Sequence, residues 1–121
     1  MIDHVGYEVS DLARAGRFYD ALLHALGSRR LHDSERLVGW GQDEPRFWLT
    51  ARSEPAPAYG HLAFAATGKA AVDAAHAAGL AAGGADDGAP GPRPRYGPRY
   101  YAGYLRDPDG LRVEVVATAF G

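Results

Sequence analysis

An alternating pattern of apolar and polar residues opens the chain and predicts a half-buried strand over Ile2–Val9. The spacing then becomes helical after Ser10 and Asp11, either of which can cap a helix. Gly27 ends that helix, because glycine readily takes the left-handed conformation of a helix C-terminus. Its apolar positions are Leu12, Ala15, Phe18, Tyr19, Leu22, Leu23 and Leu26. The chain therefore begins with a strand and an amphipathic helix.

Three short strands are expected next, separated by polar turns or by turns that contain glycine or proline. They lie at Arg29–His32, Arg36–Trp40 and Arg46–Ala51. The segment Ser53–Ala58 contains two prolines and reads as a connector. The first half of the chain is thus a β-α-β-β-β unit.

The same order of elements restarts at Gly60. A strand is expected over His61–Ala66, and Thr67 is a candidate cap for an alanine-rich helix that ends near Gly83. The chain therefore repeats its organisation, although the two halves share few identical letters.

A segment rich in glycine, proline and arginine, Gly88–Pro98, is expected to form a long loop of functional or mobile character. The last two strands are predicted at Arg99–Leu105 and Leu111–Ala117. The turn Asp107–Gly110 joins them and is assigned a structural role.

The repeat allows positions in the two halves to be compared. His61 then matches His4 at the head of a strand, and Glu114 matches Trp48 in the last strand. Two histidines and one carboxylate on the same face suit Fe, Mn, Ni, Co or Zn and leave coordination positions open. His4, His61 and Glu114 are therefore the candidate metal ligands.

The alternative is that these residues bind no metal. The histidines would then be hydrogen-bonded residues at strand ends, and Glu114 would pair with an arginine such as Arg99 or Arg112. Trp48 is either the apolar wall of a pocket or part of the core. The remaining histidines are expected on the surface: His24, His32 and His76.

Composition narrows the classes of function. A chain of 121 residues fits one domain, and a net charge of -2 gives no reason to expect nucleic acid or a membrane as partner. The absence of cysteine excludes disulfides, thiolate metal sites and cysteine nucleophiles. No leader segment or membrane span is recognisable, so we expect a cytoplasmic protein that binds a small molecule.

Three stretches are similar to the vicinal oxygen chelate superfamily: "HVGYEVSDLARAGRFYDALL" from His4, "YGHLAF" from Tyr59 and "DPDGLRVEVV" from Asp107. That superfamily includes glyoxalase I, fosfomycin and bleomycin resistance proteins and extradiol dioxygenases, and the resemblance covers nearly the whole chain. It implies an α+β fold in a single domain, residues 1–121, with βαβββ modules at about 1–54 and 59–121. The strands would form a cup-shaped mixed β-sheet with the helices outside, and two chains would pair as a homodimer.

The resemblance also implies a metal ligand in the first and the last strand of each module. The corresponding residues are His4, Trp48, His61 and Glu114. Indole cannot be the fourth ligand, because its nitrogen only donates hydrogen bonds. The remaining set resembles the two-histidine, one-carboxylate site of extradiol dioxygenases.

Two functions follow as expectations, and whether the chain is an enzyme stays open. One is a metal-dependent lyase or dioxygenase, in which Glu114 is a ligand and Glu8 is the candidate general base. The other is a metal-free protein that binds an aromatic compound or drug. The candidate substrate-binding residues are Trp48, Tyr96, Tyr101 and Arg99. Arg93, Arg95 and Arg99 form either an anion-binding lid or a solvated loop.

Overall fold

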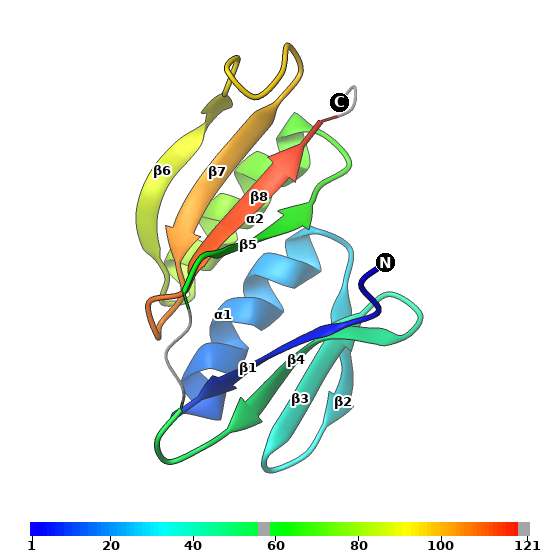
Figure 1. Cartoon of the computed structure of the whole chain (residues 1–121), viewed down its shortest axis with the longest axis vertical. Helices are drawn as coiled ribbons and strands as arrows, with labels where there is room; N and C mark the ends of the chain where they lie inside the picture. The colour runs from blue at the N-terminus through cyan, green and yellow to red at the C-terminus, as the bar shows by residue number, and fades with distance from the viewer. Residues whose placement is uncertain (56–58, 119–121) are drawn as a thin grey trace.

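The computed structural model describes residues 1–55 and 59–118, which form two βαβββ units (Figure 1). Module 1, residues 1–55, contains β1 (Val5–Val9), α1 (Leu12–Ala25), β2 (Arg29–Asp33), β3 (Leu37–Gly41) and β4 (Pro45–Ala51). Module 2, residues 59–118, contains β5 (His61–Ala65), α2 (Lys69–Ala81), β6 (Ala85–Pro92), β7 (Tyr101–Arg106) and β8 (Arg112–Ala117). The expected α+β class with two βαβββ modules is confirmed.

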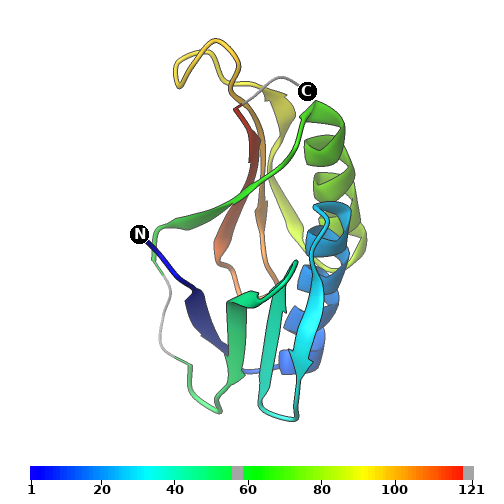
Figure 2. The same ribbon diagram turned by 90° about the vertical axis from the view of Figure 1, so that its right-hand side faces the viewer.

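Each module contributes its own four-stranded sheet, with strand orders β1-β4-β3-β2 and β5-β8-β7-β6. The first and last strands of each module pair in parallel, and the other pairs are antiparallel, so both sheets are mixed. The sheets follow one another along the long axis, and both helices lie on the same side of them (Figures 1 and 2). The opposite face of each sheet is therefore free of helices.

The parallel strand pairs of the two sheets also have equivalent registers. In module 1, Trp48 pairs with the residue two positions after His4. In module 2, Glu114 pairs with the residue two positions after His61. The backbone thus makes the histidines equivalent to each other, and Trp48 equivalent to Glu114, as the sequence repeat indicated.

Helix α1 begins and ends where its sequence predicts. The carboxylate of Asp11 accepts a hydrogen bond from the backbone N–H of Arg14 at 2.9 Å, so Asp11 rather than Ser10 is the side-chain cap. Gly27 follows the helix at φ +88°, a conformation that favours glycine. Strand β1 is shorter than expected, and His4 therefore lies just before it.

The prediction that a loop begins at Gly88 is wrong, because the residues from Gly88 to Pro92 belong to strand β6. Proline lacks a backbone donor and is tolerated at a sheet edge, where one side of the strand needs no partner. Strand β6 is an edge strand of module 2, and its pairing with β7 is interrupted by irregularities around Gly88. The loop that remains spans residues 93–100.

Helix α2 begins differently from the prediction. Its N-cap is Gly68, with no side-chain hydrogen bond at the cap, so the assignment of Thr67 is wrong. Within the described residues, neither helix is long and apolar enough to cross a membrane.

His76 on α2 is buried, with 5% of its surface exposed, which corrects the expectation of a surface residue. Its Nε2 lies 3.1 Å from Oδ1 of Asp86 and 3.1 Å from the backbone carbonyl oxygen of Tyr104. The sequence around His76 shows no partner, because both acceptors come from strands that follow the helix. His76 thus ties α2 to β6 and β7.

Both modules share one apolar core, and Tyr19 of α1 lies at its centre with no exposed surface. The Tyr19 ring contacts Phe47 of module 1 at 4.7 Å and Phe64 of module 2 at 6.4 Å between centroids. Its hydroxyl donates a hydrogen bond of 2.6 Å to the buried carboxylate of Asp107, in the turn between β7 and β8. Tyr19 therefore joins the two modules by packing and by a polar contact.

Replacement of Tyr19 by phenylalanine removes that hydroxyl and leaves the ring in place. We expect the free energy of unfolding to fall by about 1.5–3 kcal/mol, the range for a buried hydrogen bond to a charged group. Urea denaturation measures the change, with Tyr59→Phe as the control because Tyr59 is 89% exposed. Equal midpoints for Tyr19→Phe and the wild type would contradict the expectation.

A second prediction concerns the pH dependence of stability. Hydrogen bonds from the Gly88 N–H and from His76 hold the pKa of Asp86 below its ordinary value of 3.8. The ionised carboxylate therefore stabilises the fold above that value, and this contribution is lost as the pH falls through the lower folded-state pKa.

We thus expect Asp86→Asn to be less stable than the wild type at neutral pH, and the difference to shrink below about pH 4. Urea denaturation across this pH range tests it, with Glu35→Gln as a control for loss of an exposed carboxylate. A difference that stays constant down to about pH 3 would show that the charge of Asp86 makes no contribution.

Candidate functional site

The face of the module 2 sheet that points away from α2, called here the helix-free face, carries a group of ionisable residues. Val113, Val115 and Leu105 pack in the core, so the residues that alternate with them lie on the helix-free face. Glu114 is among these, and His61 and Tyr104 lie on the neighbouring strands β5 and β7.

Glu114 is the centre of this face and is only 2% exposed. The hydroxyl of Tyr100, just before β7, donates a short hydrogen bond to its Oε2. His61 places Nε2 at 3.3 Å from Oε1, with 48% of its own side chain exposed. These residues form the His61–Glu114–Tyr100 cluster, a buried carboxylate reached from solvent through a half-exposed imidazole.

The carboxylate of Glu114 affects both neighbouring phenols. Burial and then the hydrogen bond to Glu114 raise the pKa of Tyr100 well above its ordinary value. Burial and the charge of Glu114 also raise the pKa of Tyr104, which lies opposite Glu114 in the β7–β8 ladder. Both hydroxyls therefore stay protonated at neutral pH, and Tyr100 acts as a donor to the carboxylate.

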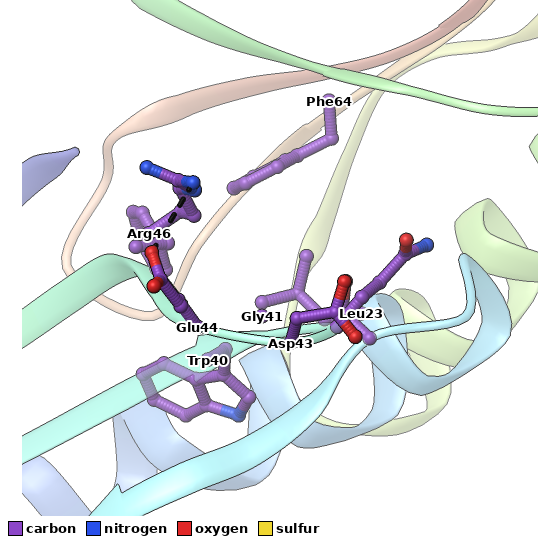
Figure 3. A pocket seen from close by; sticks show the side chains of 10 residues that line it. Leu23, Trp40, Gly41, Asp43, Glu44, Arg46 and Phe64 are labelled. Carbon is purple, nitrogen blue, oxygen red and sulfur yellow. Dashed lines mark ion pairs between the residues drawn. The ribbon is translucent and has the colours of Figure 1, made fainter. Parts of the chain in front are cut away.

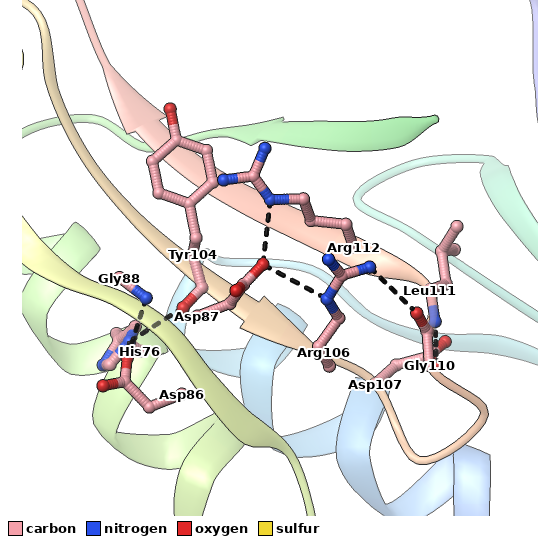
Figure 4. Close-up of polar contacts among 10 residues, drawn as sticks. All are labelled: His76, Asp86, Asp87, Gly88, Tyr104, Arg106, Asp107, Gly110, Leu111 and Arg112. Carbon is pink, nitrogen blue, oxygen red and sulfur yellow. Dashed lines mark hydrogen bonds and ion pairs between the residues drawn. The ribbon is translucent and has the colours of Figure 1, made fainter. Parts of the chain in front are cut away.

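Arg112, one of the arginines expected to neutralise Glu114, pairs with a different carboxylate. Its Nε lies 2.9 Å from Oδ2 of Asp87, and Arg106 reaches the same oxygen at 3.2 Å (Figure 4). The Arg112 guanidinium also lies over the Tyr104 ring, 4.4 Å from its centroid. Arg99 lines a neighbouring cavity of about 300 Å³ together with Tyr96 and Tyr100.

His4 does not reach the cluster within one chain. Its Nδ1 contacts Oδ1 of Asp3 at 2.8 Å, and its side chain is 59% exposed at the start of module 1. In residues 1–55 and 59–118, no group of three histidine, aspartate or glutamate side chains is placed to hold a metal ion. A single chain thus brings together two of the three candidate ligands, His61 and Glu114.

These two candidate ligands are compatible with a divalent metal ion in chemistry and in spacing. Nitrogen and oxygen ligands at 2.0–2.2 Å from a metal lie about 2.8–3.6 Å from each other in octahedral or tetrahedral geometry. The separation of 3.3 Å between His61 Nε2 and Glu114 Oε1 falls within that range. The imidazole and the carboxylate are also ligand types that Zn, Fe, Mn, Co and Ni accept.

In module 1 the position equivalent to Glu114 is occupied by an aromatic residue, Trp48. Trp48 is partly buried, and its ring lies 5.4 Å from the ring of His32. A side chain at Gly39 would come within 2.7 Å of the indole, so glycine is needed beneath it. Glu8, the candidate general base, lies on the same face and forms an ion pair with Arg52.

The tyrosines of module 2 divide between the two faces of its sheet. Tyr101 packs against the core on the helix side and donates a hydrogen bond of 2.6 Å to Asp73. The structure therefore does not bring Tyr101 to the cluster. Tyr96 is exposed, and its ring lies 5.3 Å from that of Tyr100 on the helix-free side.

Sequence reasoning missed Tyr100 and Tyr104 as the immediate neighbours of Glu114. The turn from Asp107 contains the signal, because a short hairpin fixes the pairing of the strands that it joins. Arg106 pairs with Arg112 directly beyond the turn, and the same register places Tyr104 opposite Glu114. Counting outward from the turn identifies this pair.

A second cavity, of about 320 Å³, lies where module 1 meets β5 (Figure 3). Phe64 of β5 covers one side, Trp40 and Leu23 line the floor, and Glu44 forms an ion pair of 3.3 Å with Arg46 at the rim. Its lining includes no histidine and no member of the His61–Glu114–Tyr100 cluster, so it offers less chemistry than the helix-free face.

Comparison with known proteins gives a family for this arrangement. Residues 1–115 match the family described as "Glyoxalase/Bleomycin resistance protein/Dioxygenase superfamily". No curated protein matches the chain.

Solved structures show the same fold. A glyoxalase/bleomycin resistance protein from Albidiferax ferrireducens T118 is 34% identical, with a TM-score of 0.82, over 95% of this chain and 96% of that one. A lactoylglutathione lyase from Agrobacterium tumefaciens is 24% identical, with a TM-score of 0.69, over 97% and 92%. A fosfomycin resistance protein from Mesorhizobium loti is 19% identical, with a TM-score of 0.70, over 98% and 92%.

Proposed function

The chain belongs to the glyoxalase/bleomycin resistance protein/dioxygenase superfamily, and from this we propose that it acts on a small molecule at a divalent metal ion bound by His61 and Glu114. One observation carries the proposal. His61 Nε2 and Glu114 Oε1 lie 3.3 Å apart, at a carboxylate that is almost fully buried. A buried charge is costly unless it is paired or coordinated, and a metal ion bound by Glu114 and His61 would provide that coordination.

The third ligand in this proposal is His4 of a second copy of the chain. His4 is exposed, and the register makes it equivalent to His61, so it occupies the ligand position of module 1. In a symmetric dimer, one two-fold axis would place module 1 of each copy against module 2 of the other. Two sites per dimer would result, each with two histidines and one carboxylate.

When bound, the metal would supply Lewis-acid polarisation of substrate oxygens at open coordination positions. The residues of the chain would position the substrate and move protons around it. Tyr100 holds the carboxylate of Glu114 in place through its hydroxyl. Glu8 lies on the same face of module 1 as His4, so the second copy would also bring a carboxylate for proton transfer, once it is released from Arg52.

Metal content tests this proposal directly. The purified protein is exposed separately to Mn, Fe, Co, Ni and Zn, freed of excess ions, and examined by elemental analysis. We expect about one ion per chain for one of these metals, and affinity at least about 100-fold weaker in His61→Ala, since even outer-shell changes cost 10–100-fold. His4→Ala should weaken binding as well, whereas His24→Ala, an exposed histidine on α1, should not.

Metal analysis can also contradict the proposal. Wild-type protein without stoichiometric metal would overturn the proposal, and so would His61→Ala protein that binds metal as tightly as the wild type. Equal binding by His4→Ala would overturn only the assignment of the third ligand.

A second candidate function, metal-free binding of an aromatic compound, is favoured by a different observation. Both oxygens of Glu114 already have partners within one chain, Tyr100 and His61, so the cluster is satisfied without further ligands. Trp48 and Tyr96 then provide the aromatic surfaces.

This second function predicts that chelator-treated protein binds a planar aromatic probe such as 2-naphthol. We expect Trp48→Ala to weaken that binding about tenfold, because loss of a stacked ring costs roughly 0.5–1.5 kcal/mol beyond the area lost. Isothermal titration calorimetry measures the affinity, and Phe18→Leu, a buried aromatic change on α1 away from the cavities, is the control. Unchanged affinity in Trp48→Ala would count against this function.

A further inference from the structure

A third cavity, of about 250 Å³, lies beside the cluster on module 2 and is rich in arginine. Its lining includes Arg93, Arg95, Arg112, Tyr96, Tyr104 and Asp87. Three guanidinium groups therefore face one carboxylate, in a chain whose net charge is -2. The cavity concentrates positive charge on a protein that is acidic as a whole.

The single carboxylate of this cavity does not cancel the charge. Asp87 Oδ2 accepts from Arg112 at 2.9 Å and is also 3.2 Å from Nε of Arg106, which lies outside the lining (Figure 4). One negative charge is thus shared between two arginines. Arg93 and Arg95 have no carboxylate partner among the described residues.

The guanidinium groups are held in place by rings and by backbone oxygens. Arg93 and Arg112 both lie over the Tyr104 ring, at 5.6 and 4.4 Å from its centroid. Arg95 lies 5.0 Å from the centroid of Tyr96 and donates to its hydroxyl at 3.0 Å. Stacking uses the flat face of a guanidinium and leaves its N–H edge for a further acceptor.

Backbone contacts fix Arg93 further. Its Nη2 donates to the carbonyl oxygen of Ala89 at 2.8 Å, and its Nη1 to that of Pro92 at 3.3 Å. A guanidinium carries five N–H donors, so three of these remain for a ligand. An arginine held in this way loses less conformational entropy on binding than a freely solvated one.

The cavity adjoins the His61–Glu114–Tyr100 cluster. Tyr104, which lines the cavity, lies directly opposite Glu114 in the β7–β8 ladder. Tyr96, at its other side, stacks near Tyr100, the hydrogen-bond donor to Glu114. A small ligand in the cavity would therefore have its other end next to the cluster.

We propose that Arg93, Arg95 and Arg112 bind the carboxylate or phosphate group of an aromatic small molecule, whose remaining part reaches the His61–Glu114–Tyr100 cluster. This rests on the proposed function, because it assigns the substrate class of the same site. Guanidinium groups match both kinds of anion with paired N–H donors, and Tyr96 and Tyr104 supply the ring contacts. The cavity is smaller than the roughly 300–1,000 Å³ of sites for drug-sized ligands, which fits a ligand of one ring.

Affinities for matched probes test this substrate class. Benzoate and phenyl phosphate represent the two anions, and benzamide is a neutral compound of nearly the same shape as benzoate. We expect at least one anion to bind about tenfold more tightly than benzamide, and its affinity to fall as salt is raised. Arg93→Gln and Arg95→Gln should each weaken anion binding about tenfold and leave benzamide unaffected. Arg17→Gln, which removes an exposed arginine on α1, should change neither.

The same titrations on chelator-treated protein and on His61→Ala separate this inference from the proposed function. Anion binding that persists without metal supports the arginine cavity, even if metal analysis has overturned the metal site. Anion binding that disappears with the metal would overturn the arginine assignment, because the ion would then be the binding group. Equal affinities for benzoate, phenyl phosphate and benzamide, or equal weakening by Arg17→Gln, would also overturn it.

Discussion

The hydrogen bond from the Tyr19 hydroxyl to Asp107 is the buried polar contact that links the two modules. It joins the core of module 1 to the turn between β7 and β8, the strands that carry Tyr104 and Glu114. The other carboxylate oxygen of Asp107 accepts the backbone N–H of Leu111 at 2.9 Å, so the same side chain holds the turn in shape. That turn sets the pairing of β7 with β8 and so places Tyr104 opposite Glu114. A buried tyrosine in one module thus fixes the neighbours of a carboxylate in the other.

The helix-free face of module 2 contains two polar arrangements that differ in composition and charge. At Glu114, a buried carboxylate, one histidine and one phenol form a compact cluster that contains two of the candidate metal ligands. Around Tyr104, arginines stack on a ring and keep their N–H groups available. Tyr104 lies next to both, because it is opposite Glu114 in the β7–β8 ladder and has Arg93 and Arg112 over its ring. The two arrangements therefore adjoin on one face of the sheet.

Much of this fold was predictable from the sequence, because the alternation of strands and the periodicity of helices are local properties. The repeat also predicted that His61 and Glu114 share a face, which the ladder between β5 and β8 bears out. Apart from the cap of α2, the failures come from contacts that are distant in the sequence. Strand β6 tolerates its prolines only because it lies at a sheet edge, and His76 is buried only because later strands cover it. The position of His4 relative to Glu114 depends on how modules pack, on which the residue pattern gives no information.

The two modules place a large ring in the same row of their sheets, but on different strands. In module 1, Trp48 on β4 covers Gly39 of β3. In module 2, Tyr104 on β7 lies against Gly88 of β6, and the strand equivalent to β4 carries Glu114 instead. A one-strand shift of an aromatic side chain therefore decides which half of the duplicated scaffold has room for a carboxylate. The two modules therefore differ in chemistry at equivalent positions of one scaffold, with a buried carboxylate in module 2 and an indole in module 1.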